Sequence, residues 1–229
     1  MASRPYFGPE TFDFLRELRQ NNTREWFLAN KARYEAEARD PMLLFIADFA
    51  PRLRRISRHF RADPRPVGGS LFRIYRDTRF SKDKTPYKTM VAAHFRHEAG
   101  RDVHAPGFYL HLEPGQVFAA AGLWHPDAGT LTRVRGALVA SPERWTRAVS
   151  GPAFGKTLEL WGEALTRPPK GYDPKHPLID DLRRKDFVVA ARLGEHAACA
   201  GDFMDRVGAA YQAAAPFVRF LTQAVGLPA

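Results

Sequence analysis

The segment from residue 73 to 88, RIYRDTRFSKDKTPYK, combines many positive charges with hydrophobic and aromatic residues. Apolar or aromatic side chains such as Ile74, Tyr75 and Phe80 separate its cations, which is not typical of a solvated basic tail. Guanidinium groups clamp phosphate and carboxylate oxygens through paired hydrogen bonds, and an ammonium adds a point charge. We therefore expect an anion-binding site here, with these ligand-binding candidates: Arg73, Arg76, Arg79, Lys84 and Tyr87.

The loop Lys84-Thr85-Pro86-Tyr87 is predicted to be rigid. Pro86 fixes its own φ and disfavours the helical conformation at Thr85, which sets the direction of the backbone. A rigid loop would hold Lys84 and Tyr87 in place. The alternative is an ordinary solvated basic turn.

Residues 71–77, 90–96 and 107–113 are predicted to be neighbouring strands, because short apolar runs there are bounded by turn residues. Period-two alternation puts Leu110 and its apolar neighbours on one face of the third strand, and Tyr109, His111 and Glu113 on the other. The opposite faces of the first two strands would carry Arg73, Tyr75 and Asp77, and Ala92, His94 and Arg96. These polar faces predict a cleft in which Tyr109 binds the ligand and His111, Glu113 and Asp77 act as acid–base groups.

Other interpretations of the same residues stay open. The Arg, Asp and Tyr side chains could form a network that only stabilises the fold. His111 and Glu113, with His94 or Asp77, are the types that bind a metal, but no tight ligand motif is present and the surrounding cations oppose a divalent ion. No metal site is therefore expected. No glycine-rich nucleotide loop or hydrolase motif is present either, so the sequence assigns no reaction and no cofactor, and enzymatic activity is left open.

The 229 residues carry a formal net charge of +10, with a pI of about 10.0. This excess favours anionic partners. We expect an anionic small molecule that carries phosphate, with nucleic acid as the alternative partner, and general solubility explains the charge equally well. A partner-binding protein that uses the same face is a third possibility.

Cys199 is the only cysteine, which excludes an internal disulfide and favours a reducing compartment. The N-terminus does not resemble a signal peptide, and no apolar run approaches the roughly 20 residues of a membrane span. We expect a cytoplasmic protein with no membrane partner. The oligomeric state is not predicted.

The arrangement of elements predicts an α+β fold over a single domain, residues 1–229. The first sixty residues show helical spacing, and Asn22 followed by Glu25 is a capping pattern that predicts a helix start. Strands follow in the middle of the chain, and Pro114-Gly115 predicts a tight turn between two antiparallel strands. Helical patterns return after Trp124, so the antiparallel sheet should be packed by N-terminal and C-terminal helices.

Three segments together resemble an uncharacterised, mainly bacterial family, catalogued as domain of unknown function 2461. They are RIYRDTRFSKDKTPYKT, GFYLHLEPGQVFAAAGLW and PKGYDPKHPLIDDLRRKDFVV. The family's hallmark is an Arg-x-x-Arg-Asp-x-Arg-Phe segment followed by an acid–Lys pair and a Tyr, matched here by Arg73, Arg76, Asp77, Arg79, Phe80, Asp83, Lys84 and Tyr87. The resemblance covers nearly the whole chain and implies a single domain, but it transfers no catalytic role.

Overall fold

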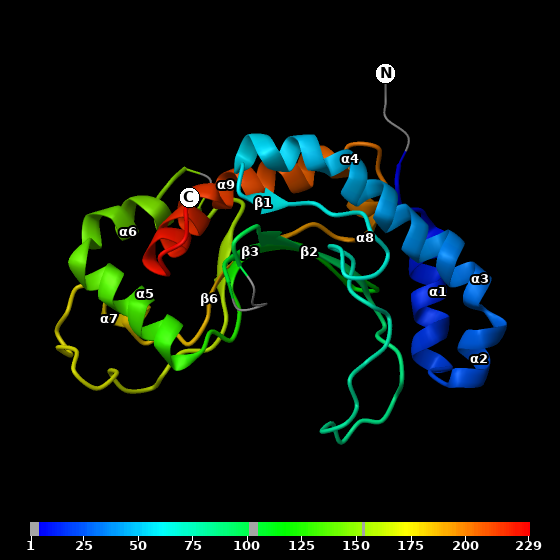
Figure 1. The fold of residues 1–229 in the computed structure, drawn as a ribbon, viewed down its shortest axis with the longest axis horizontal. Helices are drawn as coiled ribbons and strands as arrows, with labels where there is room; N and C mark the ends of the chain where they lie inside the picture. Colours follow the sequence, from blue (N-terminus) through cyan, green and yellow to red (C-terminus); the bar gives the residue numbers. More distant parts are fainter. Residues whose placement is uncertain (1–4, 101–104, 153) are drawn as a thin grey trace.

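The alternating segments in the middle of the chain form one antiparallel sheet, as predicted, in a computed structural model that describes residues 5–100, 105–152 and 154–229 (Figure 1). Its strands lie in the order β1-β2-β3-β4-β6-β5, and each neighbouring pair is antiparallel. Their bounds are β1 (Phe60–Arg61), β2 (Val91–His97), β3 (Gly107–Glu113), β4 (Gln116–Leu123), β5 (Glu159–Trp161) and β6 (Phe187–Arg192).

The predicted turn at Pro114-Gly115 is confirmed. It joins β3 to β4, with Glu113 paired to Gln116, and Gly115 has a φ of 81°, which favours glycine. This register places His111 opposite Phe118 and Tyr109 opposite Ala120. Tyr109 also lies opposite His94 of β2, so the alternating faces of three strands are aligned.

Helices precede and follow the sheet, which confirms the α+β prediction. Those before it are α1 (Pro9–Gln20), α2 (Arg24–Ala29), α3 (Lys31–Tyr34), the π-helical turn η1 (Glu35–Arg39) and α4 (Asp40–Ile56). Those after β4 are α5 (Ala128–Ala140), α6 (Pro142–Val149), α7 (Ile179–Leu182), α8 (Glu195–Ala198) and α9 (Phe203–Ala224). In the described ranges, no helix combines the length and apolar character needed to cross a membrane.

Helices α4 and α9 cover one face of the sheet, and the main core lies between them and the strands (Figure 1). Phe49 of α4 contacts Phe95 of β2 with 5.4 Å between ring centroids, and Tyr211 of α9 contacts Phe108 of β3 at 4.8 Å. These four rings are buried, so the apolar face predicted for β2 and β3 is the one that packs. Among the described residues, no helix as long as α4 or α9 packs on the other face.

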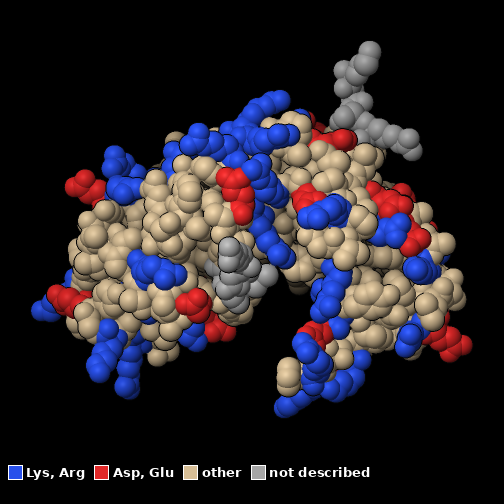
Figure 2. All heavy atoms as spheres, viewed as in Figure 1, with Lys and Arg blue, Asp and Glu red and all other residues tan. Residues whose placement is uncertain are grey.

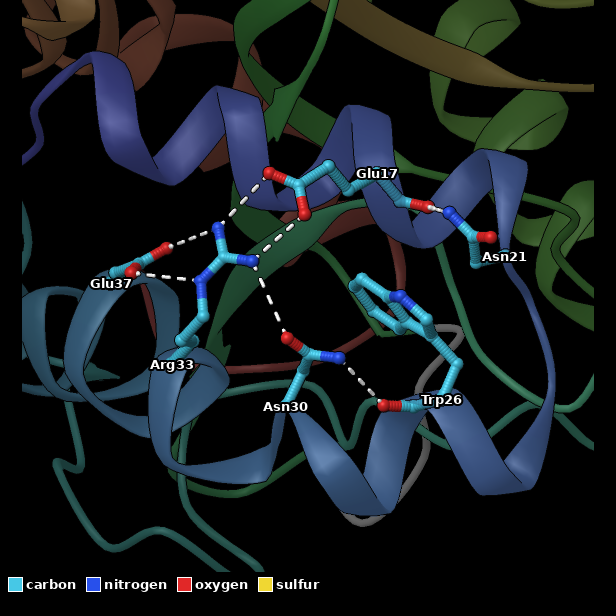
Figure 3. A network of polar contacts seen from close by, with 6 residues as sticks. All are labelled: Glu17, Asn21, Trp26, Asn30, Arg33 and Glu37. Carbon is cyan, nitrogen blue, oxygen red and sulfur yellow. Dashed lines mark hydrogen bonds and ion pairs between the residues drawn. The ribbon is translucent and has the colours of Figure 1, made fainter.

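Helix α1 is tied to the following helices by Arg33 of α3 (Figure 3). The Arg33 guanidinium donates to Glu17 of α1 at 2.8 and 3.1 Å and to Glu37 of η1 at 3.2 and 3.3 Å. The two carboxylates raise the pKa of Arg33, with the hydrogen bond to Glu17 as the largest cause. The network holds together the N-terminal helices that support the base of the 73–88 segment.

The capping prediction at Asn22 is wrong by one residue. Thr23 caps α2, because its Oγ1 accepts from the backbone N–H of Trp26 at 3.3 Å. Asn22 instead binds the backbone of Tyr87, donating from Nδ2 at 2.9 Å and accepting at Oδ1 at 3.0 Å. The turn before α2 therefore anchors the 73–88 segment.

The predicted strand at 71–77 is largely absent. Only Leu71 forms a bridge with β2, to Ala93, and Phe72 donates its backbone N–H to Ala92 at 2.9 Å. The chain then turns away and pairs with itself through a bridge between Tyr75 and Tyr87. We call residues 73–88 the arm, which projects from the sheet as a long irregular loop (Figure 1).

Candidate functional site

The sheet face opposite α4 and α9 carries a hollow lined mainly by aromatic side chains. Its volume is about 530 Å³. The lining residues are Phe72, His94, Ala105, Gly107, Tyr109, His111, Phe118, Ala120, Ala121, Gly122, Trp124, Trp161 and Val188. We call this cavity the front hollow. In Figure 2 the surface is notched below the sheet, between the arm and the part of the molecule that carries α5 and α7.

Tyr109, His111 and Glu113 form a hydrogen-bonded chain along β3, because residues two apart on a strand share a face. The Tyr109 hydroxyl lies 2.9 Å from His111 Nδ1, and His111 Nε2 lies 3.2 Å from Glu113 Oε2. An ionised carboxylate only accepts hydrogen bonds, so His111 Nε2 carries a proton and donates a hydrogen bond to Glu113. Nδ1 of a neutral imidazole is then an acceptor, and the Tyr109 hydroxyl donates to it.

The charge states favour this direction. The hydrogen bond from His111 is the largest cause that lowers the pKa of Glu113 to about 2. Burial raises the pKa of Tyr109, and the charge of Glu113 raises it further. A neutral phenol and an ionised carboxylate therefore flank the imidazole at neutral pH.

Glu113 is fixed from the opposite side by two further donors. Thr89 Oγ1 donates at 2.7 Å and Arg19 Nη2 at 2.9 Å, both to Oε1. These contacts belong to a polar cleft of about 500 Å³, lined by Arg19, Asn22, Arg76, Asp83, Thr85, Tyr87, Lys88, Thr89, Met90 and Glu113. Glu113 thus connects this cleft to the front hollow through His111.

His94 of β2 is a second titratable group in the hollow. Burial, followed by the positive charge of Arg96, lowers its pKa to about 4. The ring stacks on Phe72 with 6.2 Å between centroids, and within the described part of the chain no group hydrogen-bonds to its nitrogens. His94 is therefore a neutral imidazole facing the cavity.

Aromatic rings form the floor and the far wall of the hollow. Phe118 of β4 stacks on His111 with ring centroids 4.6 Å apart and planes at 14°. Trp161 of β5 contacts Phe118 edge-on at 4.9 Å, and the guanidinium of Arg192 lies 5.0 Å from the Trp161 ring. A flat ligand ring could stack on such surfaces.

The structure brings together only part of the predicted site. Tyr109, His111 and Glu113 are in contact, and Arg76, Tyr87 and Glu113 line the polar cleft. Asp77 is exposed and pairs with Arg79 at 2.8 Å, far along the arm, so it does not join the acid–base chain.

The arm satisfies most of its own cations. Arg76 binds Asp83 and Thr85, and Lys84 Nζ donates to the Thr78 carbonyl at 2.9 Å. Because local acids and carbonyls hold these groups, they do not converge with Arg79 on a shared cavity.

Tyr87 and Arg73 differ from the rest of the predicted set. The Tyr87 ring is 3 % exposed and stacks on Phe27 with 4.0 Å between centroids, so it belongs to the core. Arg73 is exposed, and its carbonyl accepts from Lys88 Nζ at 2.7 Å. Lys88 Nζ also lies 5.3 Å from the Phe72 ring, which places positive charge at the rim of the front hollow.

Sequence reasoning identified the polar chain but missed most of the aromatic walls. Phe118 and Trp161 were not candidates, although alternation in 116–123 puts Phe118 opposite His111. Trp161 lies on a three-residue strand, which is too short to give a pattern. In the part of the chain that the structure describes, no three His, Cys, Asp or Glu side chains are placed to hold a metal ion.

Comparison with known proteins gives a family and nothing finer. No curated protein and no solved structure matches the chain. The model of the family described as "Conserved hypothetical protein (DUF2461)" matches residues 10–220, which includes β1 to β6, the arm and nearly all of α9. The chain therefore belongs to the DUF2461 family of conserved hypothetical proteins.

Proposed function

We propose that the front hollow binds a small molecule with a flat ring and an anionic group, and that the Tyr109–His111–Glu113 chain exchanges a proton with it. The observation that carries the proposal is that this hydrogen-bonded chain ends, at the Tyr109 hydroxyl, in an aromatic cavity of about 530 Å³. Cavities of about 300–1,000 Å³ with a few convergent polar groups are the usual size of small-molecule sites.

The proton path follows from the hydrogen-bond directions. When a ligand gives a proton to the Tyr109 oxygen, the Tyr109 proton passes to His111 Nδ1, and Tyr109 stays neutral. The resulting imidazolium is stabilised by ionised Glu113, which accepts from Nε2. The reverse transfer returns the proton to the ligand, so the same chain serves as base and then as acid.

Charge at the rim supports an anionic group on the ligand. Lys88 and Arg73 lie beside Phe72, and Arg96 follows His94 on the same face of β2. The ring of the ligand would rest on Phe118 and Trp161 while its anionic group meets these cations. This assigns Arg73 to ligand binding, and leaves Arg76, Arg79 and Lys84 to the shape of the arm.

Adenosine monophosphate is a suitable probe because it has a flat ring and a phosphate. Titration followed by tryptophan fluorescence should show that adenosine monophosphate binds more tightly than adenosine alone or inorganic phosphate alone. Phe118→Ala should weaken binding about tenfold, since stacking of one base on an aromatic side chain contributes about 1–3 kcal/mol. Phe80→Ala is the control, because Phe80 is 95 % exposed at the arm. Equal losses in both variants, or no preference for the combined ligand, would reject the site.

The proton chain has its own test. Nitrogen-15 spectra of His111 should show the proton on Nε2, and Tyr109→Phe should shift the Nδ1 resonance because the donated hydrogen bond is lost. A proton found on Nδ1 would contradict the proposed path even if the hollow binds the probe.

A further inference from the structure

A second pocket lies on the opposite side of the sheet from the front hollow. It has a volume of about 280 Å³ and opens between the C-terminal end of α4 and the C-terminal half of α9. Phe60 and Phe108 form part of its floor, at 2 % and 0 % exposure, and Arg54, Arg55, Arg58 and Arg219 lie around it. We call it the rear pocket.

The four arginines are exposed and have no acidic partner within the described ranges. Arg58 Nε donates to His59 Nε2 at 3.2 Å, and His59 Nδ1 lies 2.8 Å from Glu98 Oε1, so the acid contacts the histidine and not the guanidinium. Ala229 also lines the pocket. In Figure 2, blue side chains gather over this end of α4.

Elsewhere in the described chain the arginines are commonly neutralised. Arg16, Arg33 and Arg39 on the N-terminal helices each contact one or more carboxylates, and so do Arg76 and Arg79 of the arm. The guanidinium groups around the rear pocket therefore differ from these, because no carboxylate of the described residues pairs with them. The negative end of the α4 dipole favours cations such as Arg54 and Arg55, but it does not explain Arg219, which comes from α9.

We propose that the rear pocket binds a small phosphate-bearing anion, with the phosphate held by the arginines and a short apolar part resting on Ile56 and Ala215, which also line the pocket. Guanidinium forks suit phosphate oxygens, and bringing in a multiply charged anion relieves the repulsion among four like charges. The limited volume favours a phosphate ester or a diphosphate over a larger ligand. The site does not depend on the proposed function of the front hollow.

Inorganic pyrophosphate and n-butyl phosphate are the probes, measured by calorimetric titration on the full chain. Both should bind, and n-butyl phosphate should bind more tightly than inorganic phosphate because its alkyl group covers the apolar floor. The double variant Arg54→Gln/Arg219→Gln should lose at least about tenfold in affinity, as expected when charge-assisted hydrogen bonds are removed.

The matched control is Arg24→Gln/Arg147→Gln, which removes the same charge from two other exposed arginines. It should bind the probes like the unmodified chain, and so should Tyr109→Phe, which alters only the front hollow. Equal losses in the two double variants would show a general charge effect and overturn the proposal. Failure of both probes to bind at millimolar concentration would overturn it too. The proposal would also be overturned if the chain bound duplex DNA but neither probe, and if Arg54→Gln/Arg219→Gln abolished that DNA binding.

Discussion

Glu113 connects the two cavities on its side of the sheet, since it accepts from His111 on one side and from Thr89 and Arg19 on the other. Its folded pKa of about 2 lies below the ordinary value of 4.5. The carboxylate therefore contributes stability above about pH 4.5, and the contribution is lost as the pH falls toward 2. Its charge thus matters for stability as well as for the proton path.

Glu113→Gln should lower the free energy of unfolding by about 2 kcal/mol at pH 7, because one charged acceptor of three donors is replaced. At pH 3 the difference from the unmodified chain should be smaller, since the stability that the ionised carboxylate contributes is already partly lost at that pH. Urea unfolding at both pH values measures this. Glu143→Gln, an exposed substitution on α6, should change stability little at either pH. A difference for Glu113→Gln that grows toward low pH would contradict the assignment.

His94 makes a separate prediction. Its pKa is lowered to about 4 from the ordinary 6.5, so the folded chain binds a proton there less readily than the unfolded chain. The corresponding stability is complete above pH 6.5 and declines as the pH falls toward 4. Proton NMR of the imidazole should show a midpoint near 4, and Arg96→Gln should raise it. A midpoint above 6 would show that the ring is exposed to water.

At the scale of elements, the arm owes its shape to its base. Tyr87 is buried against Phe27, and Asn22 holds the Tyr87 backbone through two hydrogen bonds. The far end carries Phe80, which is 95 % exposed. The base should therefore contribute to global stability, and the far end should not.

Tyr87→Ala should cost about 3 kcal/mol of unfolding free energy, the usual loss when a large buried aromatic side chain is truncated. Phe80→Ala should stay within about 0.5 kcal/mol of the unmodified chain. Tyr87→Phe retains the ring and should stay close to the unmodified chain. Denaturant unfolding of the three variants separates these cases, and equal stability of Tyr87→Ala and Phe80→Ala would show that the arm is not anchored.

The sequence predicted the parts of the fold that have a regular period. Alternation in 107–113 gave the correct faces of β3, including the shared side of Tyr109, His111 and Glu113, and Pro114-Gly115 gave the turn to β4. The arm could not be predicted in the same way. Its alternation imitates a strand, but Asp77 and Asp83 bind arginines within the arm and stabilise a loop.

The aromatic walls were hidden for a different reason. Trp161 reaches the front hollow only because β5 pairs with β6 at the edge of the sheet, which joins segments from distant parts of the sequence. Burial of Tyr87 depends on Phe27 in the same way. Such contacts between distant segments follow from the topology and leave no local pattern. The prediction of one domain over residues 1–229, the cytoplasmic location and the anionic ligand stay predictions.

At the scale of the whole molecule, one sheet separates two chemically different cavities. β3 contributes to both, with Phe108 in the floor of the rear pocket and the adjacent Tyr109 in the front hollow. The positive charges are unevenly neutralised, because Arg76 and Arg79 of the arm are paired with acids while the arginines of the rear pocket are not. Net charge alone therefore did not identify which basic residues are available to an anion.

Gly107 of β3 and Gly122 of β4 are paired neighbours in the sheet, and both line the front hollow. A Cβ on Gly107 would come within 2.2 Å of His94 Nε2, and one on Gly122 within 2.0 Å of the Phe187 carbonyl oxygen, where φ is 129°. Glycine at these two positions therefore leaves room for the His94 ring and for the backbone of β6. Any larger residue at position 107 would displace that imidazole from the wall, so the outline of the hollow depends on a side chain that is missing.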